Sequence, residues 1–65
     1  MAQETTRMDL AESRRKELFH RLVVAQDYAM SVAEARKMVC DLFAVVETQV
    51  VHIEEEGLER NWPPL

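Results

Sequence analysis

The chain has 65 residues, 48% of them apolar, and its 12 acidic and 8 basic residues give a formal net charge of −4. This length allows one small domain, whose core alone rarely supplies more than about 3–5 kcal/mol of stability. One cysteine excludes an intrachain disulfide framework, and the polar start and short apolar runs argue against a signal peptide or a membrane span. We therefore expect a cytoplasmic protein that needs a partner subunit for stability.

The first half of the chain has the pattern of one amphipathic helix. Residues 1–56 contain neither Gly nor Pro, which favours helices over strands and turns. Apolar or small side chains recur at steps of three or four residues between Met8 and Ala29, if Arg15 is counted as one position of the stripe. The pattern predicts a first helix over about 9–28, with Asp9, or alternatively Thr5 or Thr6, as N-cap and a frayed segment over 1–8.

The second half has clearer boundary signals. Ser31 and Glu34 form a capping box, which predicts a helix that starts at Val32. Gly57 followed by Leu58 is typical of a Schellman motif and predicts the end of this helix at 56. The short link near Ala29 and Met30 then indicates an antiparallel two-helix hairpin over 9–58, followed by an extended Trp/Pro tail over 59–65.

The apolar face of the second helix is too wide for one neighbouring helix. On a helical wheel it covers roughly 160°, so several large side chains would remain in water in a single hairpin. Each would forfeit about 1.5–3 kcal/mol of burial. The sequence therefore predicts an all-α fold in which two hairpins form a homodimeric four-helix bundle. The predicted self-association interface comprises Leu18, Leu22, Met38, Val39, Leu42, Phe43, Val46, Val50 and Ile53.

Two polar residues interrupt the apolar stripes. Arg15 on the first helix and Gln49 on the second lie at similar heights in an antiparallel hairpin. Either they face each other and set the register of the helices, or Arg15 packs its stem and extends its guanidinium to water.

The residue types that carry catalysis or metal binding are sparse. His20, Cys40 and His52 lack the spacing of a metal site, and no serine has a base placed to activate it. There is no Gly-rich phosphate loop. We expect no metal, no cofactor and no enzymatic activity.

The C-terminal part offers candidate contacts for a partner. Glu54, Glu55 and Glu56 occupy the predicted last turn, where the helix dipole disfavours negative charge by about 0.3–1 kcal/mol each. A basic partner surface would relieve this cost, although a solvated acidic face is the simpler interpretation. Trp62 either folds back over the end of the bundle or anchors a partner protein.

These features favour a non-catalytic interaction or regulatory protein that acts through self-association and an exposed apolar/acidic helix face. One alternative is an adaptor or chaperone-like subunit of a hetero-complex. A second is a small DNA-binding regulator, because residues 25–35 have the apolar rhythm of a helix-turn-helix. Residues 16–52 also resemble the helical hairpin that opens HU-type DNA-bending proteins, without their β-arm. The few basic residues after Lys37 make nucleic acid the weaker alternative.

Overall fold

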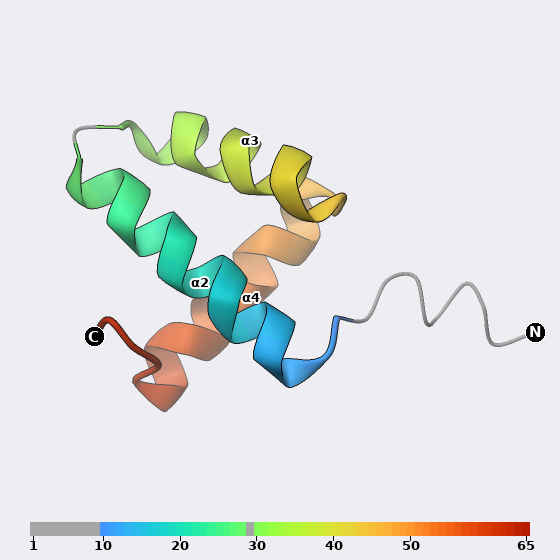
Figure 1. The fold of residues 1–65 in the computed structure, drawn as a ribbon, viewed down its shortest axis with the longest axis vertical. Coiled ribbons are helices and arrows are strands. Elements are labelled where there is room, and N and C mark those ends of the chain that lie inside the picture. The colour runs from blue at the N-terminus through green and yellow to red at the C-terminus, as the bar shows by residue number, and fades with distance from the viewer. Residues whose placement is uncertain (1–9, 29) are drawn as a thin grey trace, which may run out of the picture.

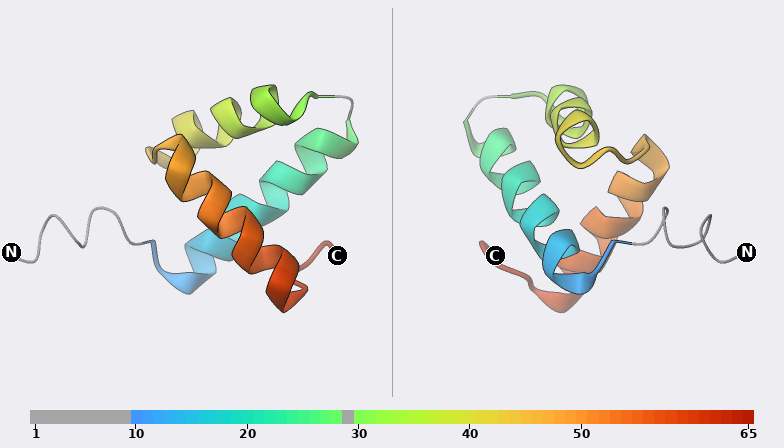
Figure 2. Two further views of the ribbon diagram at one scale, coloured as in Figure 1. Left: turned by 180° about the vertical axis from the view of Figure 1, so that it is seen from behind. Right: turned by 45° about the vertical axis from the view of Figure 1, so that its right-hand side comes forward.

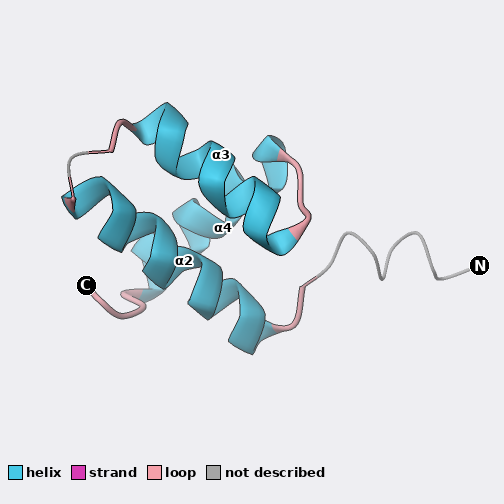
Figure 3. Cartoon of the chain, turned by 45° about the horizontal axis from the view of Figure 1, so that its top comes forward, coloured by secondary structure: helices cyan, strands magenta, loops and turns pink. Residues whose placement is uncertain are grey.

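The computed structural model describes residues 10–28 and 30–65, and this part of the chain is all-helical, without strands. It contains α2 (Glu12–Asp27), α3 (Val32–Phe43) and α4 (Glu47–Arg60). α3 follows α2 back along its length, and α4 crosses behind them (Figures 1 and 3). Each helix packs against the other two. The all-α prediction is confirmed, but the two-helix hairpin is wrong, because the segment over 32–56 forms two helices.

The start of α3 follows the predicted capping box. The Ser31 hydroxyl accepts a hydrogen bond from the Glu34 backbone N–H at 3.1 Å, and the Ser31 N–H donates to Glu34 Oε1 at 3.0 Å. α2 begins after Ala11, which makes no side-chain cap. The predicted N-cap Asp9 and the predicted link residue Ala29 lie outside the described residues.

The predicted second helix breaks at Ala44. This residue adopts the left-handed conformation, with φ 56° and ψ 46°. The N–H groups of Ala44 and Val45 both donate to the Cys40 carbonyl, as in the left-handed motifs that end helices. α4 then starts after Val46, again without a side-chain cap. A left-handed L-residue costs roughly 1–2 kcal/mol, so the break requires compensation from elsewhere in the fold.

That compensation comes from burial of α4 against the rest of the chain. The break directs α4 back across α2, so that Val50 and Ile53 enter the same core as Leu18 and Leu22 (Figure 2). Burying each of the two α4 side chains contributes about 1.5–3 kcal/mol, which exceeds the strain at Ala44. The chain thus hides within one molecule much of the apolar surface that we expected a second copy to cover.

The C-terminal end of α4 also differs from the prediction. Gly57 lies inside the helix, buried against Phe19, and a Cβ atom at this position would overlap the Phe19 ring. The helix ends instead at Arg60, and the C-cap Asn61 has φ 54°; the N–H groups of Asn61 and Trp62 donate to the Gly57 carbonyl. The helix terminates there because asparagine tolerates the left-handed conformation.

The tail folds back onto the core. Trp62 is 5% exposed and packs edge-to-face on Phe19, with ring centroids 6.1 Å apart. A hydrogen bond from the Leu65 N–H to the Trp62 carbonyl, at 3.0 Å, closes a turn over the final residues. The extended tail that the two prolines suggested is therefore not observed.

Candidate interaction surface

The predicted interface residues divide into two groups in the structure. Six of them belong to the core of the single chain: Leu18, Leu22, Val39, Phe43, Val50 and Ile53. Leu42 and Val46 are 55% and 53% exposed, and Met38 is half-buried at the edge of the core. Only these last three therefore offer apolar surface to another molecule.

Met38 lines a groove between α2 and α3, with a volume of about 640 Å³. We call this the α2–α3 groove, and its lining residues are Glu17, His20, Arg21, Val24, Ala25, Tyr28, Met30 and Met38. Its floor is apolar, and its two methionines have flexible side chains that adapt to different contact shapes. Tyr28, the C-cap residue of α2, is 80% exposed. Exposed aromatic and methionine side chains around an apolar groove are typical of protein-binding surfaces.

Leu42 extends this apolar surface along α3. It follows Met38 by four residues, so the two side chains lie on the same side of the helix. Beside them, Lys37 and Asp41 form an ion pair at 3.8 Å, with side chains 80% and 73% exposed. This part of the α3 surface therefore presents an apolar pair next to one positive and one negative charge.

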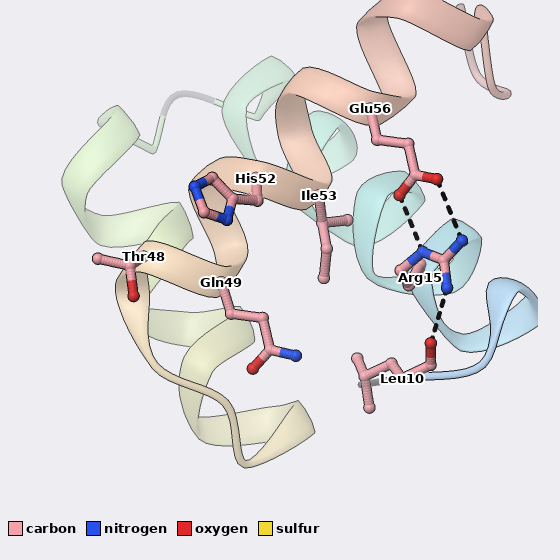
Figure 4. A pocket seen from close by; sticks show the side chains of 7 residues that line it. All are labelled: Leu10, Arg15, Thr48, Gln49, His52, Ile53 and Glu56. Atoms are coloured by element: carbon pink, nitrogen blue, oxygen red, sulfur yellow. Dashed lines mark hydrogen bonds and ion pairs between the residues drawn. The ribbon is translucent and has the colours of Figure 1, made fainter. Parts of the chain in front are cut away.

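A second hollow, of about 560 Å³, lies between α4 and the start of α2 (Figure 4). Its main feature is a bidentate ion pair, in which Arg15 Nε and Nη2 donate to the two carboxylate oxygens of Glu56 at 2.8 and 3.1 Å. Arg15 Nη1 also donates to the Leu10 carbonyl at 2.8 Å. The hydrogen bond from Arg15 lowers the pKa of Glu56, helped by the charges of Arg15 and Arg60 and opposed by burial.

The ion pair in this hollow stabilises the fold. Arg15 and Gln49 both line it, as the expected similar heights imply, but the bidentate partner of Arg15 is Glu56. The ion pair connects α2 to α4 on the side where Trp62 packs. We therefore assign Arg15 and Glu56 to closure of the three-helix fold.

The residues predicted to meet a partner are mostly engaged within the chain. Glu54 accepts a hydrogen bond from Arg36 Nη2 at 2.9 Å, and Glu56 pairs with Arg15. Glu55 remains exposed, and Trp62 is buried over the core. Sequence reasoning missed these two ion pairs because their partners are 18 and 41 residues apart along the chain.

The reactive residue types do not converge. Within residues 10–28 and 30–65, no group of three His, Cys, Asp or Glu residues is arranged to hold a metal ion. Cys40 is a half-buried free thiol, whose pKa is raised by burial and by the negative charges of Glu47 and Asp41. His20 lines the α2–α3 groove and His52 the hollow beside Arg15. None of the described helices has the length and apolarity needed to cross a bilayer.

Sequence reasoning identified Met38 and Leu42 but not the groove itself. The apolar periodicity of α3 marked both residues. The opposite wall, from Glu17 to Tyr28, depends on how α2 packs against α3. Comparisons with known protein families, curated proteins and solved structures found no match for this chain.

Proposed function

We propose that the protein is a non-catalytic interaction protein that acts in the cytoplasm through self-association, with a regulatory role exerted by its assembled form. The observation that carries this proposal is the apolar surface of the α2–α3 groove together with the exposed Leu42, one helical turn after Met38, outside the core of the chain. Apolar surface of this kind on a small domain marks a site that another molecule covers.

The arrangement favours binding over catalysis. The groove has an apolar floor and a few charged groups at its rim, and Glu17 is paired there with Arg14 and Arg21. A paired carboxylate whose neighbours already neutralise it is a poor general acid or base. The groove therefore supports docking of side chains better than chemistry on a substrate.

The dimer that we now propose differs from the bundle of hairpins expected from the sequence. Since α4 buries Val50 and Ile53 within its own chain, these residues do not need a second copy. The contact surface that we propose lies on α3 and the adjoining part of α2. Two copies that meet there would give a compact assembly of two three-helix domains.

The molecular mass in solution across a dilution series tests the proposal. Sedimentation velocity should show two chains per particle at high concentration and one chain after dilution. A particle of one chain at every concentration would contradict self-association and support an adaptor subunit that contacts a different protein.

The DNA-binding alternative is tested in a separate titration with labelled duplex DNA. Binding that weakens steeply with salt would support this alternative, because release of counterions dominates nonspecific DNA affinity. The exposed charges of α3 do not favour it, since Glu34 and Asp41 flank Lys37.

A further inference from the structure

We propose that two copies associate about a twofold axis that crosses α3 near Val39 and Cys40, with the two α3 helices antiparallel. In this arrangement Leu42 of each copy enters the α2–α3 groove of the other copy and packs beside Met38. The inference rests on the proposed self-association and specifies its geometry.

The first support is that the surface is complementary to itself. A twofold contact needs a protrusion and a receiving groove on the same patch. Leu42 supplies the exposed apolar side chain, and Met38 lines the groove one helical turn earlier. An antiparallel pair with its axis at Cys40 places Leu42 of one copy opposite Met38 of the other, and does so twice.

The second support is the charge pattern beside these residues. An antiparallel pair with its axis at Val39 brings Lys37 of one copy opposite Asp41 of the other, again twice. The two axis positions differ by one residue, so an axis midway between them leaves each pair offset by one residue, which is about 1.5 Å along a helix. One axis therefore brings both the apolar and the charged residues close to each other. A parallel pair would instead bring Lys37 against Lys37 and Asp41 against Asp41, which is repulsive.

The third support is that the outer side of α3 is accessible in the fold. Viewed from the side in Figure 2, α2 and α4 lie below α3, and the side of α3 away from them is uncovered by the described chain. Lys37, Asp41 and Leu42 are all exposed on α3. A second copy can therefore approach without opening the core.

The test begins with Leu42→Asp and its matched control Leu58→Asp. Both leucines are 55% exposed and helical, so both variants should keep the circular dichroism spectrum of the folded chain. A charge forced into the partner's groove should raise the dimer Kd of Leu42→Asp roughly tenfold or more, measured by sedimentation. Leu58→Asp should leave the Kd unchanged.

Charge exchange tests the antiparallel register. Lys37→Asp alone and Asp41→Lys alone each place like charges opposite each other twice and should weaken self-association. An equal mixture of the two variants should form heterodimers, because both opposite-charge contacts are then restored. The double variant Lys37→Asp/Asp41→Lys should also recover a dimer.

The outcomes separate this geometry from the proposed function. A wild-type chain that stays monomeric overturns both. A wild-type dimer that tolerates Leu42→Asp overturns the geometry alone and places the interface elsewhere. A mixture of the two charge variants that forms no heterodimer overturns the antiparallel register.

Discussion

The connections on either side of α3 are both short, yet they are stabilised in different ways. The α2–α3 connection leads into a capping box that involves only Ser31 and Glu34. The α3–α4 connection has no side-chain cap and contains a left-handed alanine. Contacts between α4 and α2, far from the turn, hold it in place, including Phe19 with Trp62 and Arg15 with Glu56. The first connection is a local feature of the sequence, and the second is a consequence of tertiary packing.

The strongest test of this difference removes the tertiary contact at the end of α4. Trp62→Ala should destabilise the fold by about 3–5 kcal/mol, because a large buried ring leaves a cavity against Phe19. This is comparable to the whole stability expected of a chain of this size. Urea denaturation followed by circular dichroism measures the loss. Trp62→Phe keeps an aromatic ring and should lose much less; equal losses for both variants would contradict the packing role.

The next test increases the volume at the crossing of α2 and α4. Alanine at Gly57 should gain helix propensity, but its methyl group meets the Phe19 ring, and overpacking of this kind costs about 1–3 kcal/mol. We expect a net loss of stability in thermal denaturation. In the double variant Phe19→Leu/Gly57→Ala the smaller side chain makes room, so the two changes should cost less than their sum. Full additivity would show that Gly57 and Phe19 do not interact.

The parts of the fold that depend on local contacts could be predicted from the sequence, and the parts that depend on tertiary packing could not. The helical class and the start of α3 were predictable, because Ser31 and Glu34 satisfy each other's backbone groups within one turn. The break at Ala44 was not, because alanine favours helices and its left-handed conformation depends on the burial of Val50 and Ile53 further along. Gly57 gave a false signal, since it serves close packing inside a helix. Asn61 was a usable signal for the end of α4 that we overlooked.

The same distinction applies to the candidate site. Met38 and Leu42 could be selected because their spacing places them on one face of one helix. Their neighbours Val39 and Phe43 belong to the same apolar pattern but are buried within the chain. Periodicity alone does not separate a residue that faces the chain's own core from one that faces another molecule. Where α4 packs decides which residues of the apolar pattern are buried within the chain.

Removing the local cap should have a moderate effect. Ser31→Ala should destabilise the fold by about 1 kcal/mol, because the N–H of Glu34 loses its acceptor. Ser13→Ala is the matched control, since Ser13 is exposed within α2 and caps no helix. The control should be neutral or slightly stabilising in urea denaturation. A loss for Ser31→Ala no larger than that of Ser13→Ala would contradict the capping role.

Relieving the strained turn should raise stability by a small amount. Ala44→Gly removes the penalty of a left-handed alanine but makes the unfolded chain more flexible, so we expect a net gain of about 0.5–1 kcal/mol. The same substitution at Ala33, an exposed residue within α3, should instead cost about 1 kcal/mol. Opposite signs in thermal denaturation would support the break, whereas losses at both positions would indicate a continuous helix through Ala44.

The smallest expected effect concerns the pH dependence of the Arg15–Glu56 closure. Because the folded pKa of Glu56 is lowered, its contribution to stability is present above its unfolded pKa of about 4.3 and is lost as the pH falls through the folded pKa. The wild type should thus lose more stability between about pH 6 and pH 3 than Glu56→Gln, which has no carboxylate to protonate there.

Glu55→Gln is the control, since no ion pair involves Glu55 in the described ranges, and it should retain the wild-type dependence. Both side chains of the pair are about one quarter exposed, so solvent screening keeps the difference small. Identical pH profiles for the wild type and Glu56→Gln would show that the Arg15–Glu56 ion pair does not contribute to holding α4, and that the α3–α4 connection depends on the other contacts of α4, such as Phe19 with Gly57.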